Sequence, residues 1–306
     1  MRKSKGKNGK AITAVLLIAV SLFCVCAFVK ANNSPVEPPN PAMRLAQGFT
    51  DPINAQGSAV PVRVQGSMVP IRVSDINNTH FLELVNLKYA IKSDPDNSQI
   101  VSAWPAIPVS SIGASINKTA LGAASRMFAA ARKANAGSYY LSSGYRNYDE
   151  QKQTYDEEAD KSYAQPPGHS EHETGLAMDI MAAGVTQNAL AASKQGQWLA
   201  DNSWQFGFIL RYQQGKQNIT GISYEPWHFR YIGQPHAYYC YKNNLCLEEY
   251  IQFLKDKGGY EITLDGKKYS VFYEKPQNGI INVPGGLSYE VSDDNTGGYI
   301  ITAWGG

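Results

Sequence analysis

An uncharged run of 19 residues, 11–29, limits where this chain can fold. Five basic residues and no acidic residue precede it. This pattern directs a chain across a membrane and leaves the basic end in the cytoplasm. The length suits a retained anchor. A cleaved signal peptide would have a shorter apolar core and a small-residue site, for which residues 29–31 (VKA) are a weak match. We favour the anchor for residues 1–31 and leave cleavage open. In both cases the body is expected outside the cytoplasm, anchored to the membrane or secreted.

Charge is unevenly distributed along the 306 residues, which contain 28 basic and 26 acidic side chains. Six of the basic residues, and none of the acidic ones, lie in residues 1–31, so the rest of the chain is mildly acidic. That balance argues against a nucleic-acid partner. With 43% hydrophobic and 18% charged residues, the composition excludes disorder throughout.

Composition divides the remaining chain into three parts. Residues 32–75 are rich in Pro, Asn and Ser and are expected to be a linker, although residues 60–73 alternate weakly and could form one or two edge strands. Residues 76–257 form the body. In residues 258–306, short alternating runs are separated by glycines, and Asp265-Gly266 is typical of a hairpin turn. This small β-rich module either binds a ligand of its own or packs on the body.

Helices and short strands alternate irregularly in the body, which favours an α+β fold over a doubly wound sheet. Asn147 and Glu150 form a capping pair at the start of one helix. The expected helices cover residues 118–134, 147–159, 187–204, 235–242 and 247–255, and the expected strands 139–142, 177–181, 208–212 and 229–232.

Cys240 and Cys246 are the only cysteines outside the apolar run. In an oxidising compartment such a pair can form a disulfide. The alternative is two small buried apolar side chains. Their spacing does not decide between the two.

Two histidines lie close to acidic residues. His172 is followed by Asp179, and Gly175 between them lets the chain turn. Together with His228 they offer two nitrogens and a carboxylate, which is a ligand set for catalytic zinc. Glu225 lies three residues before His228, near enough to take a proton from water and pass it to a leaving amine. Each pattern also occurs by chance, so the residues alone leave a structural role open.

Three segments together resemble the VanY-type D-alanyl-D-alanine carboxypeptidases. They are residues 142–146 (SSGYR) through Gln151, 167–179 (PGHSEHETGLAMD) and 225–231 (EPWHFRY). This family belongs to a zinc peptidase superfamily that includes D-Ala-D-Ala dipeptidases and the hedgehog domain. The resemblance covers about residues 76–256, and it implies a hedgehog/DD-peptidase-like fold for the body.

The resemblance also implies a role for each matching residue. His172, Asp179 and His228 match the family's zinc ligands, and Glu225 matches its catalytic base. Arg146 matches an arginine that binds substrate and stabilises the oxyanion. Gln151 and Ser143 match positions that hold the terminal carboxylate of the peptide, and Trp227 matches the pocket wall.

The activity implied is removal of the terminal D-alanine from peptidoglycan stem peptides. An L,D-carboxypeptidase acting on tetrapeptide stems stays open, because the same motifs resemble that subgroup. A cytoplasmic D,D-dipeptidase fits poorly with an export segment. A non-catalytic, zinc-stabilised module that binds wall peptide is a second hypothesis, but it would not need Glu225 as a base. A third is a wall-anchoring protein that acts through residues 258–306.

Overall fold

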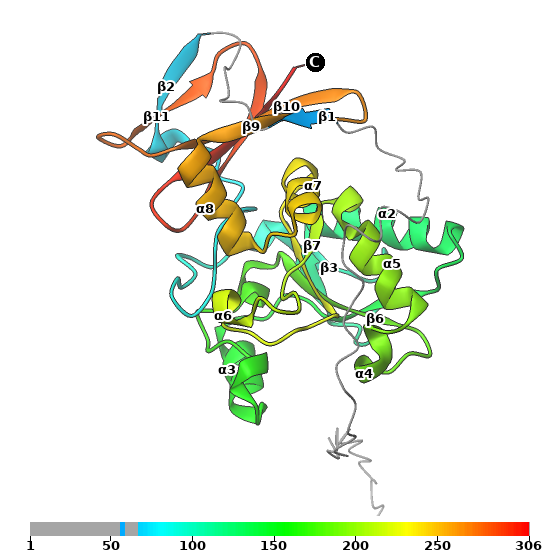
Figure 1. Cartoon of the computed structure of the whole chain (residues 1–306). Helices are drawn as coiled ribbons and strands as arrows, with labels where there is room; N and C mark the ends of the chain where they lie inside the picture. Colours follow the sequence, from blue (N-terminus) through cyan, green and yellow to red (C-terminus); the bar gives the residue numbers. More distant parts are fainter. Residues whose placement is uncertain (1–55, 59–66, 306) are drawn as a thin grey trace, which may run out of the picture. The chain divides into compact units, whose positions relative to one another are not determined.

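A computed structural model describes residues 56–58 and 67–305 (Figure 1). They belong to one compact unit. The predicted membrane segment and most of the predicted linker lie outside these residues. Within the described part of the chain, no helix is long and apolar enough to cross a bilayer.

A four-stranded antiparallel sheet lies at the centre of the body, in the order β5-β6-β8-β7. The strands are β5 (Tyr139–Ser143), β6 (Ala177–Ala182), β8 (His228–Tyr231) and β7 (Phe208–Leu210). The register pairs Ser143 with Asp179 and Asp179 with His228. Residues from three separate segments thus lie in one row across the sheet.

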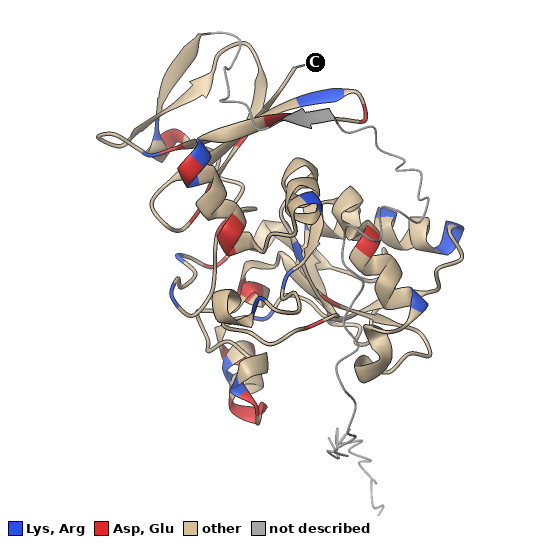
Figure 2. Cartoon of the chain, viewed as in Figure 1, with Lys and Arg blue, Asp and Glu red and all other residues tan. Residues whose placement is uncertain are grey.

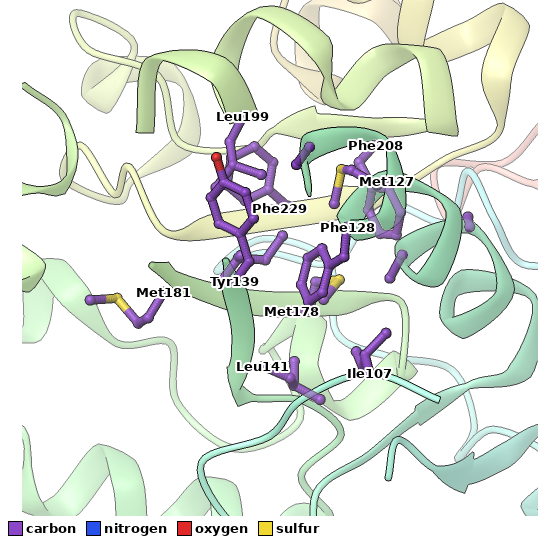
Figure 3. Close-up of a cluster of buried hydrophobic side chains, with 14 of the residues drawn as sticks. Ile107, Met127, Phe128, Tyr139, Leu141, Met178, Met181, Leu199, Phe208 and Phe229 are labelled. Carbon is purple, nitrogen blue, oxygen red and sulfur yellow. The ribbon is translucent and has the colours of Figure 1, made fainter. Parts of the chain in front are cut away.

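Helix α2 (Lys118–Lys133) packs on this sheet through a face of small and apolar side chains. Asn117 caps the helix, because its side chain accepts hydrogen bonds from the backbone N–H groups of Thr119 and Ala120. Phe128 meets Tyr139 and Phe229 in the core (Figure 3). The predicted helix is confirmed and ends one residue earlier than expected.

The predicted helix over residues 187–204 is wrong as a single element. It divides into α4 (Gln187–Leu190), α5 (Lys194–Asn202) and a 3-10 turn, η6 (Ser203–Phe206). Ser193 caps α5 by accepting from the backbone N–H of Gly196. A Cβ on Gly196 would lie 1.9 Å from the carbonyl oxygen of Leu190, so the chain folds back tightly here.

The other predicted elements of the body are confirmed within a few residues. The helices are α3 (Tyr148–Glu157), α7 (Gln234–Asn243) and α8 (Leu247–Lys257), and α3 begins with the capping box of Asn147 and Glu150. Shorter elements were not predicted: the hairpin of β3 (Ile100–Ser102) and β4 (Ser115–Asn117), helix α6 (Gln217–Thr220) and several 3-10 turns.

The C-terminal module contains a five-stranded sheet in the order β1-β9-β10-β13-β12 and a second sheet of two strands, β11 and β2. Asp265 and Gly266 form the predicted hairpin turn with φ angles of 51° and 76°. Two strands come from the segment predicted as a linker, and one of them lies within residues 60–73 as expected. The strands are β1 (Gln56–Ser58), β2 (Met68–Arg72), β9 (Gly259–Leu264), β10 (Lys267–Glu274), β11 (Ile280–Pro284), β12 (Ser288–Asp293) and β13 (Tyr299–Trp304).

The module and the body share one hydrophobic core. Tyr260, Ile262 and Val271 from the module pack with Trp204 and Ile232 from the body, and residues of α7 and α8 complete the cluster. Of the two alternatives that the sequence left open for the module, the structure shows packing on the body, and the boundary at residue 257/258 does not separate two cores.

A chain of hydrogen bonds runs through this shared core. Tyr260 donates to the carbonyl of Pro235 (3.1 Å), so Tyr250 must donate to Tyr260 (3.0 Å). The hydroxyl of Tyr250 then accepts from Nδ1 of His236 (2.6 Å), whose Nε2 accepts from Thr302 (2.9 Å). His236 is therefore neutral, and burial lowers its pKa from 6.5 to about 3.

Cys240 in α7 and Cys246 just before α8 are both buried and carry free thiols. Of the two alternatives for this pair, the structure supports the small buried apolar side chains. Burial raises the pKa of both thiols, so they stay protonated and unreactive at neutral pH.

Candidate metal centre

Three side chains converge at one end of the central sheet. His172 lies in the 3-10 turn η5 (Glu171–Thr174), Asp179 in β6 and His228 at the start of β8. One ligand atom from each lies within 4.8 Å of the others. Gly175 ends η5 in the left-handed conformation (φ 71°), so the turn predicted between His172 and Asp179 is confirmed.

Each imidazole directs one nitrogen to Asp179. Nε2 of His172 lies 3.5 Å from Asp179 Oδ1, and its Nδ1 lies 2.7 Å from the carbonyl oxygen of Gly144. His228 is turned the other way, with Nδ1 3.4 Å from Asp179 Oδ1. Because the Gly144 carbonyl can only accept, Nδ1 of His172 carries the proton and Nε2 is free to bind a cation.

The arrangement fits a zinc ion. Asp179 Oδ1 is buried and has no hydrogen-bond partner among the described residues. A buried polar atom without a partner is costly, and a cation held by this oxygen and two imidazoles would satisfy it. Burial alone would raise the pKa of Asp179, but His172 and His228 lower it, so its carboxylate is ionised.

Glu225 lies at the edge of this cluster in the turn before β8. Its Oε2 is 3.4 Å from Nδ1 of His228, and its backbone N–H donates to the carbonyl of Tyr212 (3.1 Å). The side chain is only 5% exposed. Burial raises the pKa of Glu225, and His228 partly opposes this.

Arg146 follows β5 and approaches the cluster from another side. Its Nε donates to Oε1 of Gln151 (2.8 Å) and its Nη1 to Oγ of Ser143 (2.6 Å). Burial lowers its pKa, while the charges of Asp179 and Glu225 act in the opposite direction. The guanidinium is thus fixed in place, and no described residue accepts a hydrogen bond from Nη2.

Gln151 is the only buried residue of α3, whose other positions are largely charged and exposed (Figure 2). Its Oε1 accepts from Arg146 and its Nε2 donates to the carbonyl of Gln165 (2.7 Å). Both ends of the amide are therefore engaged within the protein. Trp227 stacks on Tyr163, with ring centroids 6.4 Å apart.

Comparison with known proteins assigns the segment that contains this site to a family. Residues 113–234 match the family model VanY, D-alanyl-D-alanine carboxypeptidase. The solved LdcB LD-carboxypeptidase is 38% identical, with 55% of this chain and 84% of that chain covered and a TM-score of 0.50. This chain belongs to the VanY family.

Two further relatives extend the comparison. A D-alanyl-D-alanine carboxypeptidase of Enterococcus faecium is 40% identical over 183 residues, or 60% of this chain and 59% of the relative. The chain thus spans about three fifths of that enzyme's length. A D,D-dipeptidase, VanXYg, solved with a D-Ala-D-Ala phosphinate analogue, is 26% identical with a TM-score of 0.66. The comparison covers 78% of this chain and 98% of that chain. The expected α+β peptidase fold is confirmed.

Three charged residues of this VanY-family site were not predicted. Glu171, Arg211 and Arg230 are completely buried, and both guanidiniums donate to Oε1 of Glu171 (2.8 and 2.9 Å). Arg230 could have been inferred, because alternate residues of a strand share a face and His228 lies two positions before it. For Arg211 the sequence holds no comparable signal.

Proposed function

We propose that this protein is an extracytoplasmic, zinc-dependent D,D-carboxypeptidase that removes the terminal D-alanine from peptidoglycan stem peptides. The observation that carries the proposal is the convergence of one nitrogen of His172 and one of His228 on Oδ1 of Asp179, with Glu225 beside them. This buried oxygen has no hydrogen-bond partner among the described residues. Membership of the VanY family supports it, and the E. faecium relative bears the name of this activity.

The residues would divide the chemistry as follows. Zinc held by His172, Asp179 and His228 would supply Lewis acidity to the scissile carbonyl and to the attacking water. Glu225 takes the proton of that water and returns it to the amine of the departing D-alanine. Its buried position next to His228 keeps this carboxylate close to the reacting atoms.

Arg146 would stabilise the negative charge that develops on the carbonyl oxygen. A cation already held in position needs no reorganisation as the charge appears. Ser143 and Gln151 hold it there, and Nη2 faces no partner among the described residues. Trp227, stacked on Tyr163, would form the wall of the substrate pocket.

An L,D-carboxypeptidase is the second candidate. The specific observation in its favour is the 38% identity to LdcB, which is described as an LD-carboxypeptidase that recognises peptidoglycan. The catalytic groups would be the same, and the difference would lie in how the residue before the scissile bond is held.

One experiment tests the activity and both specificities. The purified full-length chain is incubated with pentapeptide and with tetrapeptide stems, and mass spectrometry identifies the products. We expect loss of one alanine from the pentapeptide, abolished by a chelator and restored by zinc. Cleavage of the tetrapeptide alone would support the L,D alternative. If both peptides stay intact in the presence of zinc, the non-catalytic binding module becomes the better description.

Replacement of the general base gives the sharpest test of Glu225. We expect Glu225→Gln to lower kcat by about 10²–10⁴-fold, because proton transfer in the transition state is lost. Zinc content, measured by elemental analysis, should not change, because Glu225 is not one of the three ligands. Glu157→Gln, at the exposed end of α3, is the matched control and should leave both quantities unchanged. Unaltered hydrolysis by Glu225→Gln would exclude the role proposed here.

The extracytoplasmic location is supported by the apolar run at residues 11–29. Protease added to intact cells should degrade the body if the segment is a retained anchor. A released, shortened chain in the medium would indicate cleavage. Protection of the body until the cells are lysed would contradict the location.

A further inference from the structure

Beyond the three ligand side chains, the far side of His228 faces a fully buried carboxylate. Nε2 of His228 lies 3.4 Å from Oε2 of Glu171, and among the described residues neither atom has another hydrogen-bond partner. Nδ1 of the same ring faces Asp179 and Glu225. Both nitrogens of the His228 ring therefore face carboxylate groups.

A neutral imidazole that donates its lone pair to a metal carries its proton on the other nitrogen. If Nδ1 of His228 binds the metal, Nε2 must carry the proton. The only acceptor that faces this N–H among the described residues is Glu171 Oε2.

Glu171 is itself held rigidly. Its Oε1 accepts from Nε of Arg211 and Nη1 of Arg230, and all three side chains are fully buried. Arg230 also donates through Nη2 to the backbone carbonyl of Glu83 (2.9 Å). Because Oε1 is fixed by two bonds, the direction in which Oε2 points is fixed as well.

We propose that Glu171 is a positioning residue of the metal centre: it accepts the Nε2 proton of His228 and so holds that ring with Nδ1 toward the metal. The inference rests on the proposed metal centre. It gives the two ligand imidazoles opposite roles, since His172 binds through Nε2 with a neutral carbonyl behind it, whereas His228 binds through Nδ1 with a carboxylate behind it. A charged acceptor makes the stronger hydrogen bond and the more electron-rich ligand.

A purely structural role is the alternative, in which Glu171 only neutralises two buried arginines. Glu248 provides the matched control. It pairs with the same Arg211 through two hydrogen bonds (2.7 and 2.8 Å), and its other side-chain partner among the described residues is Asn86, which lies outside the metal cluster. Glu171→Gln and Glu248→Gln therefore each remove one carboxylate charge from Arg211, and only the first also changes the acceptor of His228.

The test compares zinc affinity of the full-length chain and these two variants by competition with a chromophoric chelator. We expect Glu171→Gln to bind zinc about 10–100-fold more weakly than the unmodified chain, as is typical when the partner of a ligating histidine is lost. Glu248→Gln should lose stability but keep zinc affinity within a few-fold. Equal affinities of the two variants would overturn the inference. No zinc binding by the unmodified chain would instead refute the proposed metal centre.

A measurement on the unmodified protein keeps the test decisive if Glu171→Gln does not fold. In protein with ¹⁵N-labelled histidine, loaded with ¹¹³Cd, the metal should couple to Nδ1 of His228 and to Nε2 of His172. The Nε2 proton of His228 should exchange slowly with solvent. Coupling of the metal to Nε2 of His228 would overturn the proposal.

Discussion

At the scale of single residues, the direction of Arg146 depends on its neighbours. Gln151 and Ser143 each accept one of its N–H groups, and Gln151 is in turn anchored to the carbonyl of Gln165. The family resemblance predicts that Gln151 and Ser143 hold the carboxylate of the substrate. Their observed contacts show how each can act on the substrate through Arg146, by holding the guanidinium in place.

A double-mutant cycle on Arg146 and Gln151 tests this dependence. Gln151→Ala removes a hydrogen bond to a charged group, worth about 1.5–3 kcal/mol, so kcat/KM should fall about 10–100-fold. If Gln151 acts only through Arg146, the double variant with Arg146→Ala should be no less active than Arg146→Ala alone. Independent, multiplicative losses in kcat/KM would show that Gln151 contacts the substrate directly.

The sequence was informative for residues that occur in a recognisable local pattern. His172, Asp179, His228 and Glu225 are brought together as predicted, because their segments form adjacent strands and turns. Their roles remain proposals. Glu171 could not have been assigned a role, although it precedes His172, because only the folded chain shows which nitrogen of His228 it faces.

At the scale of elements, strand β4 passes so close to Gly144 that no side chain fits there. A Cβ on Gly144 would lie 2.2 Å from the carbonyl oxygen of Ser115, and the next N–H, from Tyr145, donates to that oxygen (2.7 Å). The carbonyl of Gly144 is also the acceptor for His172. The contact between β4 and residues 144–145 thus fixes one metal-site histidine.

Gly144→Ala should therefore damage both stability and metal binding. Overpacking against a backbone atom costs about 1–3 kcal/mol in the free energy of unfolding. Displacement of the acceptor should also weaken zinc binding through His172. Gly113→Ala is the matched control, because a Cβ there meets nothing within 4 Å. Urea unfolding and chelator competition measure the two effects, and normal zinc affinity in Gly144→Ala would contradict the positioning role of its carbonyl.

Elements were predicted well where local signals determine them. The capping box of α3 and the Asp265-Gly266 hairpin are both present. The single helix expected over residues 187–204 failed because Gly196 packs against the carbonyl of Leu190, and hydrophobic periodicity does not report such a close approach. The short hairpin of β3 and β4 was missed because three-residue strands carry too little pattern.

At the scale of the whole molecule, the module and the body are joined by a polar chain inside a hydrophobic core. His236 in α7 contacts Tyr250 of α8 and Thr302 of β13, so one neutral imidazole connects three elements. Both of its nitrogens are occupied, and protonation of Nε2 would force the hydroxyl of Thr302 to turn away. Because the module and the body share this core, the change in composition at residue 257/258 does not mark a boundary between two separately packed domains.

This burial predicts acid sensitivity. The pKa of His236 is about 3 in the folded chain, against 6.5 for the unperturbed group. Between those values the unfolded state binds more protons, so the free energy of unfolding falls as pH decreases from 6.5 toward 3. From pH 7 to pH 4 the loss from this group is on the order of 3 kcal/mol.

Urea unfolding at pH 7 and pH 4 measures that loss. His236→Gln is the comparison, because its amide can donate to Tyr250 and accept from Thr302 without titrating in this range. We expect the stability of the variant to depend less steeply on pH than that of the unmodified chain. Parallel pH dependences would show that His236 does not titrate as its surroundings predict.

The strand order also determines when this protein can finish folding. Strand β1 pairs with β9 and β2 with β11, so the earliest described residues find their partners only in strands that are synthesised after the body. The body is encoded entirely between them. Contacts between such distant parts of a chain form slowly. Until the C-terminal strands have been synthesised, β1 and β2 have no strand to pair with, and the apolar side of α8 is not covered by a sheet. A truncated chain therefore exposes an apolar surface that quality-control proteases can recognise.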